Sequence, residues 1–300
     1  MSAADIARAL GNAEHEGRGW WRCVCPRHYG HSLTVHDRPG GRIVVQCFGG
    51  CDYKTVFRAL FDLGLLGGDY DRLPMNDDFL IEQERERDDR EAAIRRKRFI
   101  AAKIWDAAKP GVKSPQLKRY LGSRGITIAP PVSLRWVEKV WHSTTRQTGI
   151  EYPAMIGKVV DVTGELIAIH KTYLTADGSA KVCGIQDKEY LAPVAGGAVR
   201  LAWFDPERPL IIGEGTESTL SLMQLRGLPG WSALSAGGIK ALVLPRAVRR
   251  VLIAVDNDRN GAGQDAAREA AWRWQQEGRE VRVAMPPVGC DFNDVLRGGV

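Results

Sequence analysis

Acidic residues follow two short apolar segments in the last third of the chain. Glu214 comes directly after the run Leu-Ile-Ile-Gly at 210–213, and Asp256 and Asp258 follow the run Val-Leu-Ile-Ala-Val at 251–255. Residues two positions apart in an extended segment point to the same side, so the two aspartates would converge. Converging carboxylates repel one another unless a cation neutralises them. A few hard oxygen ligands that leave room for water suit Mg²⁺ (or Mn²⁺) bridging to a phosphate.

The elements that carry these acids have the pattern of a parallel α/β sheet. Short apolar runs alternate with helical patterns between 206 and 300, as expected for strands that are buried on both faces. Ligands of such sheets bind beyond the carboxyl ends of the strands, where Glu214 and Asp256 stand. Glu214 could therefore join the metal shell or act as a general base on a hydroxyl. Asp291 and Asp294 are weaker candidates for the same metal, because an aspartate in this setting also caps a helix.

A second group of residues, near the N-terminus, has the spacing of a zinc site. Cys25 and His28 are followed, about twenty residues later, by Cys47 and Cys51. Two closely spaced ligand pairs separated by a β-hairpin can hold tetrahedral Zn²⁺, and the intervening residues read as two strands and a turn. Cys23 could replace Cys25 or remain a free thiol. A domain this small has little core, so zinc would contribute to its folding.

The composition of the chain limits its domain count, its partners and its location. The chain has 300 residues, enough for two or three domains, and its formal net charge of +6 is compatible with a nucleic-acid partner. The sequence contains no apolar run of about 18 residues, which argues against a membrane partner. The N-terminal residues lack the charged and apolar regions of a signal peptide, so we expect a cytoplasmic protein.

We predict a mixed α/β chain in four parts. A charged stretch from about 75 to 108 has the pattern of one long solvated helix with ion pairs between residues four positions apart. The predicted parts are a small zinc-ribbon-like β domain at 1–66, a helical linker at 67–109, the first part of a mixed α/β core at 110–205, and a Rossmann-like domain at 206–300.

The acidic segments resemble a known module. Glu-Gly at 214–215, followed by Asp-Asn-Asp and two glycines within 256–263, is similar to the Toprim domain of primases, topoisomerases and related nucleases. The resemblance implies that Glu214 takes part in acid–base chemistry and that Asp256 and Asp258 hold magnesium.

One position departs from the pattern of that family. Bacterial primases usually carry a further acid four residues after the glutamate, and this chain has Ser218 there. The adjacent Glu217 could substitute for it as a metal ligand.

The N-terminal cysteine pattern resembles a second family. Cys-Pro-Arg-His at 25–28 and Cys-Phe-Gly-Gly-Cys-Asp at 47–52 are similar to the zinc-binding domain of DNA primases, in the form found in phages and mobile elements. The resemblance implies that Cys25, His28, Cys47 and Cys51 are the zinc ligands and that the hairpin helps to recognise the template. Both patterns together on one chain are much more specific for primases than either alone.

Basic residues of the intervening region are candidates for phosphate contacts. Segments 120–126 and 170–174 resemble the part of phage-type primase cores that precedes Toprim, where a basic cleft faces the metal site. Ordinary exposed bases are the competing interpretation. Residues 235–240 form a small-residue loop that could approach a phosphate or be a plain strand-to-helix turn. The candidates are Lys118, Arg119, Arg124, Lys171, Lys181 and Lys240.

These observations together favour a DNA primase of the phage or mobile-element kind. The expected reaction is magnesium-dependent nucleotidyl transfer that builds short RNA primers from NTPs on single-stranded DNA during DNA replication. The alternatives are a Toprim nuclease or other DNA-processing enzyme, and a non-catalytic zinc-containing DNA-binding protein. The sequence contains no Gly-x-x-x-x-Gly-Lys-Ser/Thr phosphate loop, so we expect any replicative helicase partner to be a separate chain.

Overall fold

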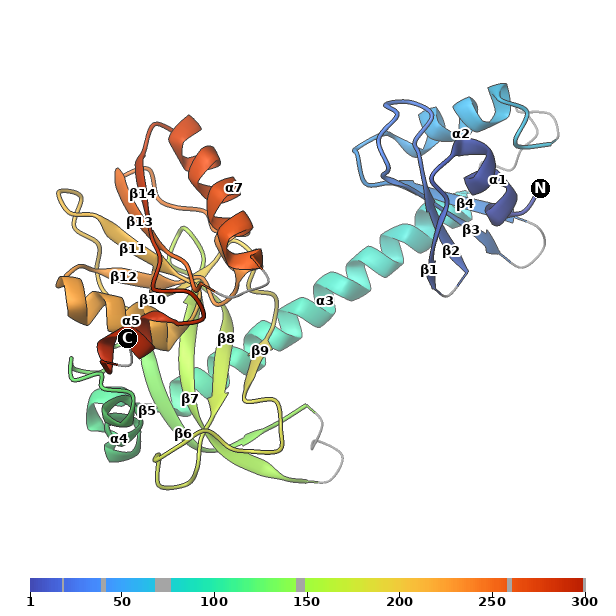
Figure 1. The fold of residues 1–300 in the computed structure, drawn as a ribbon. Helices are drawn as coiled ribbons and strands as arrows, with labels where there is room; N and C mark the ends of the chain where they lie inside the picture. Colours follow the sequence, from blue (N-terminus) through green and yellow to red (C-terminus); the bar gives the residue numbers. More distant parts are fainter. Residues whose placement is uncertain (18, 39–41, 68–76, 144–148, 258–260, 299–300) are drawn as a thin grey trace. The chain divides into compact units, whose positions relative to one another are not determined.

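The described chain forms two compact units. The computed structural model describes residues 1–300 except 18, 39–41, 68–76, 144–148, 258–260 and 299–300 (Figure 1). One unit is Met1–Arg85 and the other is Glu86–Val300. Helix α3 (Asp77–Ala107) runs through the boundary and confirms the predicted long helix. Within the described residues, no helix has both the length and the apolar character needed to cross a membrane.

The first unit is a small antiparallel sheet with two helices. Its four strands pair in sequence order, and both helices pack on the sheet around buried aliphatic residues such as Ile6, Val35 and Leu60. The hairpin predicted between the two zinc-ligand pairs is present as β3 and β4. The elements are α1 (Ala3–Leu10), β1 (Glu14–Gly17), β2 (Trp20–Cys23), β3 (Leu33–Arg38), β4 (Arg42–Cys47) and α2 (Tyr53–Asp62).

The second unit is built on one ten-stranded sheet (Figure 1). Its strands run in the order β14-β13-β11-β12-β10-β7-β6-β5, and β8 pairs with β7 and β9. The strands are β5 (Lys109–Pro110), β6 (Leu134–Trp141), β7 (Glu151–Val160), β8 (Leu166–Tyr173), β9 (Lys188–Leu191), β10 (Ala198–Arg200), β11 (Leu210–Gly213), β12 (Gly230–Ser232), β13 (Arg250–Ala254) and β14 (Glu280–Ala284). The helices are α4 (Pro115–Ser123), α5 (Thr216–Arg226), α6 (Ala236–Ala241), α7 (Ala262–Gln276) and α8 (Phe292–Leu296), with a 3₁₀ turn η2 at Gly111–Lys113.

Strand β7 joins the two halves of this sheet. It pairs antiparallel with β6, β8 and β10, and β10 leads through β12 to the parallel strands β11, β13 and β14. The predicted parallel α/β arrangement after residue 206 is therefore confirmed, and it continues into an antiparallel sheet formed by the preceding segment. The antiparallel part and the parallel part share one hydrogen-bonded framework.

Both faces of the central parallel strand β11 are covered, as its continuous apolar run predicts. Successive residues of a strand point to opposite faces. Ile211 belongs to the apolar cluster that includes Leu220 of α5, whereas Ile212 belongs to the cluster that includes Trp274 of α7. Since these side chains are fully enclosed on either side, the acids that follow β11 and β13 stand only beyond the strand ends.

Candidate zinc centre and active site

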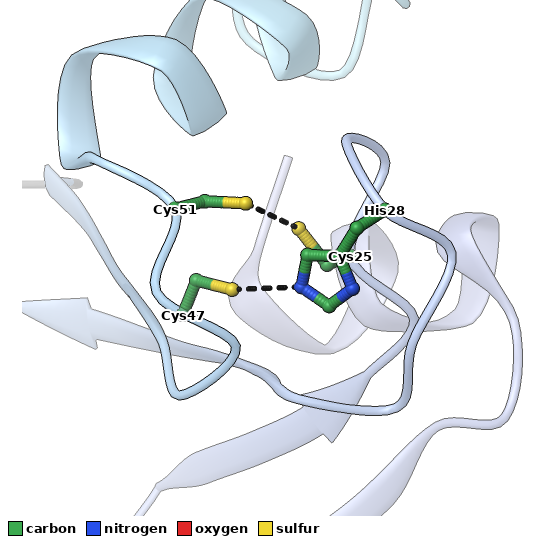
Figure 2. A group of neighbouring side chains, drawn as sticks. All are labelled: Cys25, His28, Cys47 and Cys51. Carbon is green, nitrogen blue, oxygen red and sulfur yellow. Dashed lines mark hydrogen bonds between the residues drawn. The ribbon is translucent and has the colours of Figure 1, made fainter.

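Three thiols and one imidazole converge in the first unit. Figure 2 shows Cys25, His28, Cys47 and Cys51 facing one another, with all four ligand atoms within 4.8 Å of each other. Cys25 Sγ lies 4.0 Å from Cys51 Sγ, and His28 Nε2 lies 3.1 Å from Cys47 Sγ. Zinc ligands lie about 2.0–2.3 Å from the metal, so neighbouring ligands of one tetrahedral ion are about 3.5–3.8 Å apart. The cluster has the dimensions and the donor types of a structural zinc site.

Local backbone structure brings these four residues together. Cys25 and His28 lie in the loop after β2, where the Cys25 N–H donates to the Gly30 carbonyl over 2.8 Å. Cys47 is the last residue of β4, and Cys51 precedes the N-cap of α2. The hairpin β3–β4 therefore sets the separation between the two ligand pairs.

Gly49 allows the imidazole to lie against the backbone of the second ligand pair. A Cβ atom at this position would lie 2.4 Å from His28 Nε2 and 2.9 Å from Ser32 Oγ, closer than side-chain atoms normally approach. The hydroxyl of Ser32 in turn lies 3.0 Å from the same imidazole nitrogen. Glycine at this position is thus a steric requirement of the site.

The electrostatics of the cluster favour a bound cation. Burial tends to raise the pKa of Cys47, but hydrogen bonds with Ser32 and His28 outweigh it and lower that pKa to about 6. Burial and the neighbouring thiols Cys47 and Cys25 raise the pKa of Cys51 to about 11. Adjacent thiolates repel one another, so all three become anionic together only beside a cation such as Zn²⁺.

Cys23 is separate from this cluster. Its side chain is fully buried in the apolar core of the first unit, and burial together with the neighbouring Cys25 raises its pKa to about 12. Of the two alternatives that the sequence leaves open, the structure favours Cys25 as the ligand.

The first two predicted acids lie at one edge of the parallel sheet. Strands β11 and β13 pair in register, with Gly213 opposite Ala254. Glu214 directly follows β11, and Asp256 stands two residues beyond the end of β13. Asp258, the third predicted acid, lies outside the described residues.

Gly263, in the first turn of α7, shows how near these acids are. A Cβ atom there would lie 3.6 Å from Glu214 Oε2 and 3.3 Å from the Asp256 carbonyl oxygen. The Glu214 carboxylate and the backbone of Asp256 therefore both lie next to the start of α7. The positive end of a helix dipole stabilises carboxylates in this position.

Asp291 and Asp294 cap the N-terminus of helix α8. Asp291 is the N-cap of α8, and its Oδ1 accepts the Asp294 N–H over 2.8 Å, while Asp294 Oδ2 accepts the Asp291 N–H over 3.1 Å. This reciprocal capping box is the competing interpretation of these aspartates, and it accounts for both. In the part of the chain that the structure describes, the zinc cluster is the only group of three or more His, Cys, Asp or Glu side chains close enough to hold one ion.

The predicted basic residues divide into exposed and paired ones. Lys118 and Arg119 are exposed on α4, and Arg119 donates to the Asp177 carbonyl over 2.7 Å. Arg124 is half-buried at the end of α4. Lys240 forms an ion pair of 2.8 Å with Glu269 and keeps a side-chain exposure of 40%.

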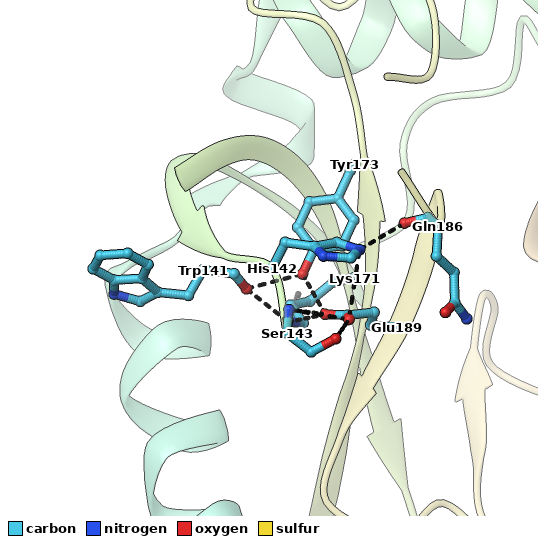
Figure 3. Close-up of polar contacts among 7 residues, drawn as sticks. All are labelled: Trp141, His142, Ser143, Lys171, Tyr173, Gln186 and Glu189. Carbon is cyan, nitrogen blue, oxygen red and sulfur yellow. Dashed lines mark hydrogen bonds and ion pairs between the residues drawn. The ribbon is translucent and has the colours of Figure 1, made fainter. Parts of the chain in front are cut away.

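Lys171 is in the interior, which corrects its sequence-based assignment. Figure 3 shows Lys171 within a polar network, in which its Nζ donates to the Trp141 carbonyl over 2.9 Å and to Glu189 Oε2 over 2.8 Å. The Tyr173 hydroxyl donates to the same carboxylate oxygen over 2.7 Å. Burial tends to raise the pKa of Glu189, but hydrogen bonds from Lys171, Ser143 and Tyr173 lower it to about 2. An ammonium enclosed in this way cannot reach a phosphate.

Lys181 belongs to a second polar group, which we name the Glu217 cluster. Its members are Tyr120, Lys181, Asp187, Lys188 and Glu217. Glu217 is 4% exposed; its Oε1 accepts from the Tyr120 hydroxyl over 2.7 Å, and its Oε2 lies 3.4 Å from Lys188 Nζ. Lys181 Nζ lies 2.7 Å from Asp187 and 3.9 Å from Glu217.

Charge compensation keeps Glu217 and Lys188 ionised. Burial alone would raise the pKa of Glu217, but Lys188 and Lys181 hold it well below its usual range. The carboxylate of Glu217 in turn raises the pKa of Lys188. Nothing in the sequence pattern points to Lys188 or to the pairing of Tyr120 with Glu217, because 97 residues separate the latter two.

Two sequence families match this chain. Residues 95–201 match a domain of unknown function (DUF7146), and residues 209–299 match the Toprim domain. The chain contains a Toprim domain. Its limits enclose Glu214, Asp256 and the helices α5 and α7 that flank the parallel strands. A search of curated proteins gave no match.

Several solved structures show a weak likeness to the whole chain or to its core. The Aquifex aeolicus primase (zinc-binding and RNA polymerase domains) has a TM-score of 0.46 and 16% identity, covering 99% of this chain and 80% of that one. The catalytic core of E. coli primase gives 0.42 and 17%, covering 67% and 75%. The primase fragment of the bacteriophage T7 primase-helicase protein gives 0.36 and 17%, covering 61% and 66%. The function proposed below rests on the site residues and the Toprim match.

Replacement of a cysteine ligand should release zinc. We expect purified Cys47→Ser to contain less than half an equivalent of zinc per chain, because a three-ligand site binds Zn²⁺ much more weakly. Cys23→Ala is the matched control and should retain about one equivalent, since that thiol only packs in the core. Zinc content is measured by inorganic mass spectrometry. Loss of zinc from Cys23→Ala with retention in Cys47→Ser would reverse the assignment.

Asp291 and Asp256 should respond differently to the same substitution. Asparagine caps a helix about as well as aspartate, so Asp291→Asn should leave Mn²⁺ binding within a factor of about two and thermal stability nearly unchanged. Asp256→Asn should weaken Mn²⁺ binding by about tenfold or more, because it removes a charged ligand. Electron paramagnetic resonance of free Mn²⁺ gives both affinities. Equal loss in the two variants would make Asp291 a ligand as well.

Removal of the Lys171 ammonium should destabilise the second unit. Lys171→Met leaves the Glu189 carboxylate in a nearly closed site without its cation, and we expect the free energy of unfolding to fall by about 3 kcal/mol. Lys139→Met, at an exposed lysine of β6, should change it by less than about 0.5 kcal/mol. Urea unfolding followed by circular dichroism measures both, and equal stabilities would contradict the structural role of Lys171.

The same network predicts a pH dependence in acid. The folded-state pKa of Glu189, about 2, is below its ordinary value of 4.5, so its ionisation stabilises the fold above pH 4.5. This contribution should decline as the pH falls from 4.5 towards 2. Urea titrations of the wild-type chain and of Glu189→Gln across this range should therefore converge, and a constant difference would contradict the assignment.

Proposed function

We propose that this protein is a DNA primase, a nucleotidyltransferase that joins ribonucleotides on a single-stranded DNA template. The observation that carries the proposal is the meeting of Glu214 and Asp256 at one strand edge of a Toprim domain. A four-ligand zinc cluster on the same chain supports it, since the combined pattern resembles primases of the phage or mobile-element kind.

The donor set at this edge fits a magnesium ion. Glu214 and Asp256 offer hard carboxylate oxygens, and Asp258 would complete the set. Magnesium, when bound, supplies positive charge that stabilises the charge developing on the transferred phosphoryl group and on the pyrophosphate. Glu214 would either share this ion or accept the proton of the 3′-hydroxyl that attacks the α-phosphate.

The substrates implied are NTPs and a single-stranded template. Lys118 and Arg119 on the exposed side of α4, with Arg124 at its end, are proposed phosphate contacts, and Lys240 on α6 is another. Lys171 is not retained in this role. The zinc domain is proposed to help in recognising the template, and a replicative helicase would act as a separate chain.

Primer synthesis tests the proposal directly. The purified protein is incubated with single-stranded DNA, labelled NTPs and Mg²⁺, and the products are separated by length. We expect short RNA oligomers from the wild type and a loss of at least about 10³-fold in Asp256→Ala and Glu214→Gln, since these remove charge at the reacting centre. Asp106→Ala, at an exposed position of α3, is the control and should retain full activity.

Two other outcomes would redirect the assignment. Shortened DNA in place of RNA oligomers, lost in Asp256→Ala, would indicate a Toprim nuclease that uses the same acids. Binding of DNA without turnover, unchanged in Asp256→Ala, would indicate a non-catalytic zinc-containing DNA-binding protein.

A further inference from the structure

Glu217 lies one helical turn after Glu214, at the start of α5, yet its environment differs from that of a metal ligand. Both carboxylate oxygens are engaged inside the protein. Oε1 accepts from the Tyr120 hydroxyl over 2.7 Å and lies 3.9 Å from Lys181, while Oε2 lies 3.4 Å from Lys188. The side chain is 5% exposed, so a hydrated ion could reach it only if these partners were displaced.

The lysines of the Glu217 cluster are far more open than the acid between them. The side chains of Lys181 and Lys188 are 33% and 34% exposed. An ammonium group has three N–H donors, and the contact with Glu217 occupies one of those on Lys188. Buried Glu217 therefore orients the ammonium group of Lys188. The remaining N–H donors of that ammonium can face a ligand.

Lys188 also lies beside the acidic edge of the Toprim domain. It begins β9, and two residues later the Tyr190 hydroxyl donates to the carbonyl of Leu234, in the loop between β12 and α6, over 3.0 Å. Strand β12 pairs with β11, and the Ser232 hydroxyl donates to the Glu214 carbonyl over 3.0 Å, so the loop after β12 lies at the edge where Glu214 stands. Strand β9 thus carries Lys188 to the edge where Glu214 stands.

We propose that Glu217 is a positioning residue that holds Lys188 and Lys181 beside this edge, where they bind the triphosphate of the incoming nucleotide. This inference rests on the proposed function and names the part of the site that would take the nucleotide. A lysine oriented by a glutamate contacts nucleotide phosphates in protein kinases, where the pair works by the same physical means. Glu217 then does not replace the missing acid at Ser218 as a metal ligand.

The first test compares anion and metal binding in Glu217→Gln. With inorganic tripolyphosphate as the probe in calorimetry, we expect affinity to fall by at least tenfold, because the lysines lose the carboxylate that orients them. Mn²⁺ binding, measured by paramagnetic resonance, should stay within twofold. In primer synthesis, the KM for NTP should rise by at least tenfold with a smaller change in kcat. Glu207→Gln, at an exposed glutamate of the same domain, should match the wild type in all three.

A second pair of variants separates positioning from folding. Glu217→Gln leaves two cations near a neutral amide and could unfold the domain, so Glu217→Gln/Lys188→Met removes the excess charge as well. We expect the double variant to regain thermal stability and still bind tripolyphosphate at least tenfold more weakly than the wild type. Tyr120→Phe, which keeps every charge, should fold normally and show a smaller loss of tripolyphosphate affinity.

Specific results would overturn the inference. Recovery of both stability and tripolyphosphate binding in the double variant would show a purely structural role. Weaker Mn²⁺ binding with unchanged tripolyphosphate binding in Glu217→Gln would make Glu217 a metal ligand. If the wild type makes no RNA oligomers but tripolyphosphate binding still depends on Glu217, the proposed primase function fails and the anion site stands.

Discussion

The parallel pairing of β11 with β13 is the interaction on which the candidate active site depends. Two strands that run in the same direction end at the same edge, so the residues that follow them meet there although about forty positions separate them along the chain. Glu214 and Asp256 stand at the same edge of the sheet for this reason. The apolar residues before these acids are enclosed between α5 and α7, and this packing fixes the register of the two strands. The fixed register in turn holds the backbone positions of Glu214 and Asp256.

The charged and polar side chains of this fold have different kinds of partner. The cysteine and histidine side chains have the geometry of a zinc site, and the buried carboxylates of Glu217 and Glu189 are paired with lysines. Asp291 and Asp294 bind the free N–H groups at the start of α8. Glu214 and Asp256 stand at the end of the parallel strands, beside the start of α7. A buried or crowded charge is tolerated only with a partner, and the kind of partner separates structural acids from candidate metal ligands.

The continuous sheet links the Toprim domain to the segment that precedes it. Strand β7 is shared by β6, β8 and β10, and β9 reaches back from β8 to the loop that follows β12. Tyr120 of α4 and Lys188 of β9 both contact Glu217 of α5 through this arrangement. A nucleotide site at this edge would therefore be composed of residues from both matched families and would require their common sheet.

The sequence by itself determined the elements and the residues whose chemistry is local. The spacing of Cys25, His28, Cys47 and Cys51 predicts their cluster because a short hairpin returns the chain to its starting point. The apolar runs that end in acids likewise predict parallel strands, because burial on both faces requires such runs. Tertiary structure alone decided which charges are paired. The register between β8 and β9 sets Lys171 opposite Glu189, and the tertiary fold brings the Tyr120 hydroxyl of α4 to Glu217 of α5. Tyr120 and Glu217 are 97 positions apart, and the pairing of Lys171 with Glu189 depends on a strand register that the residues of neither strand specify by their spacing.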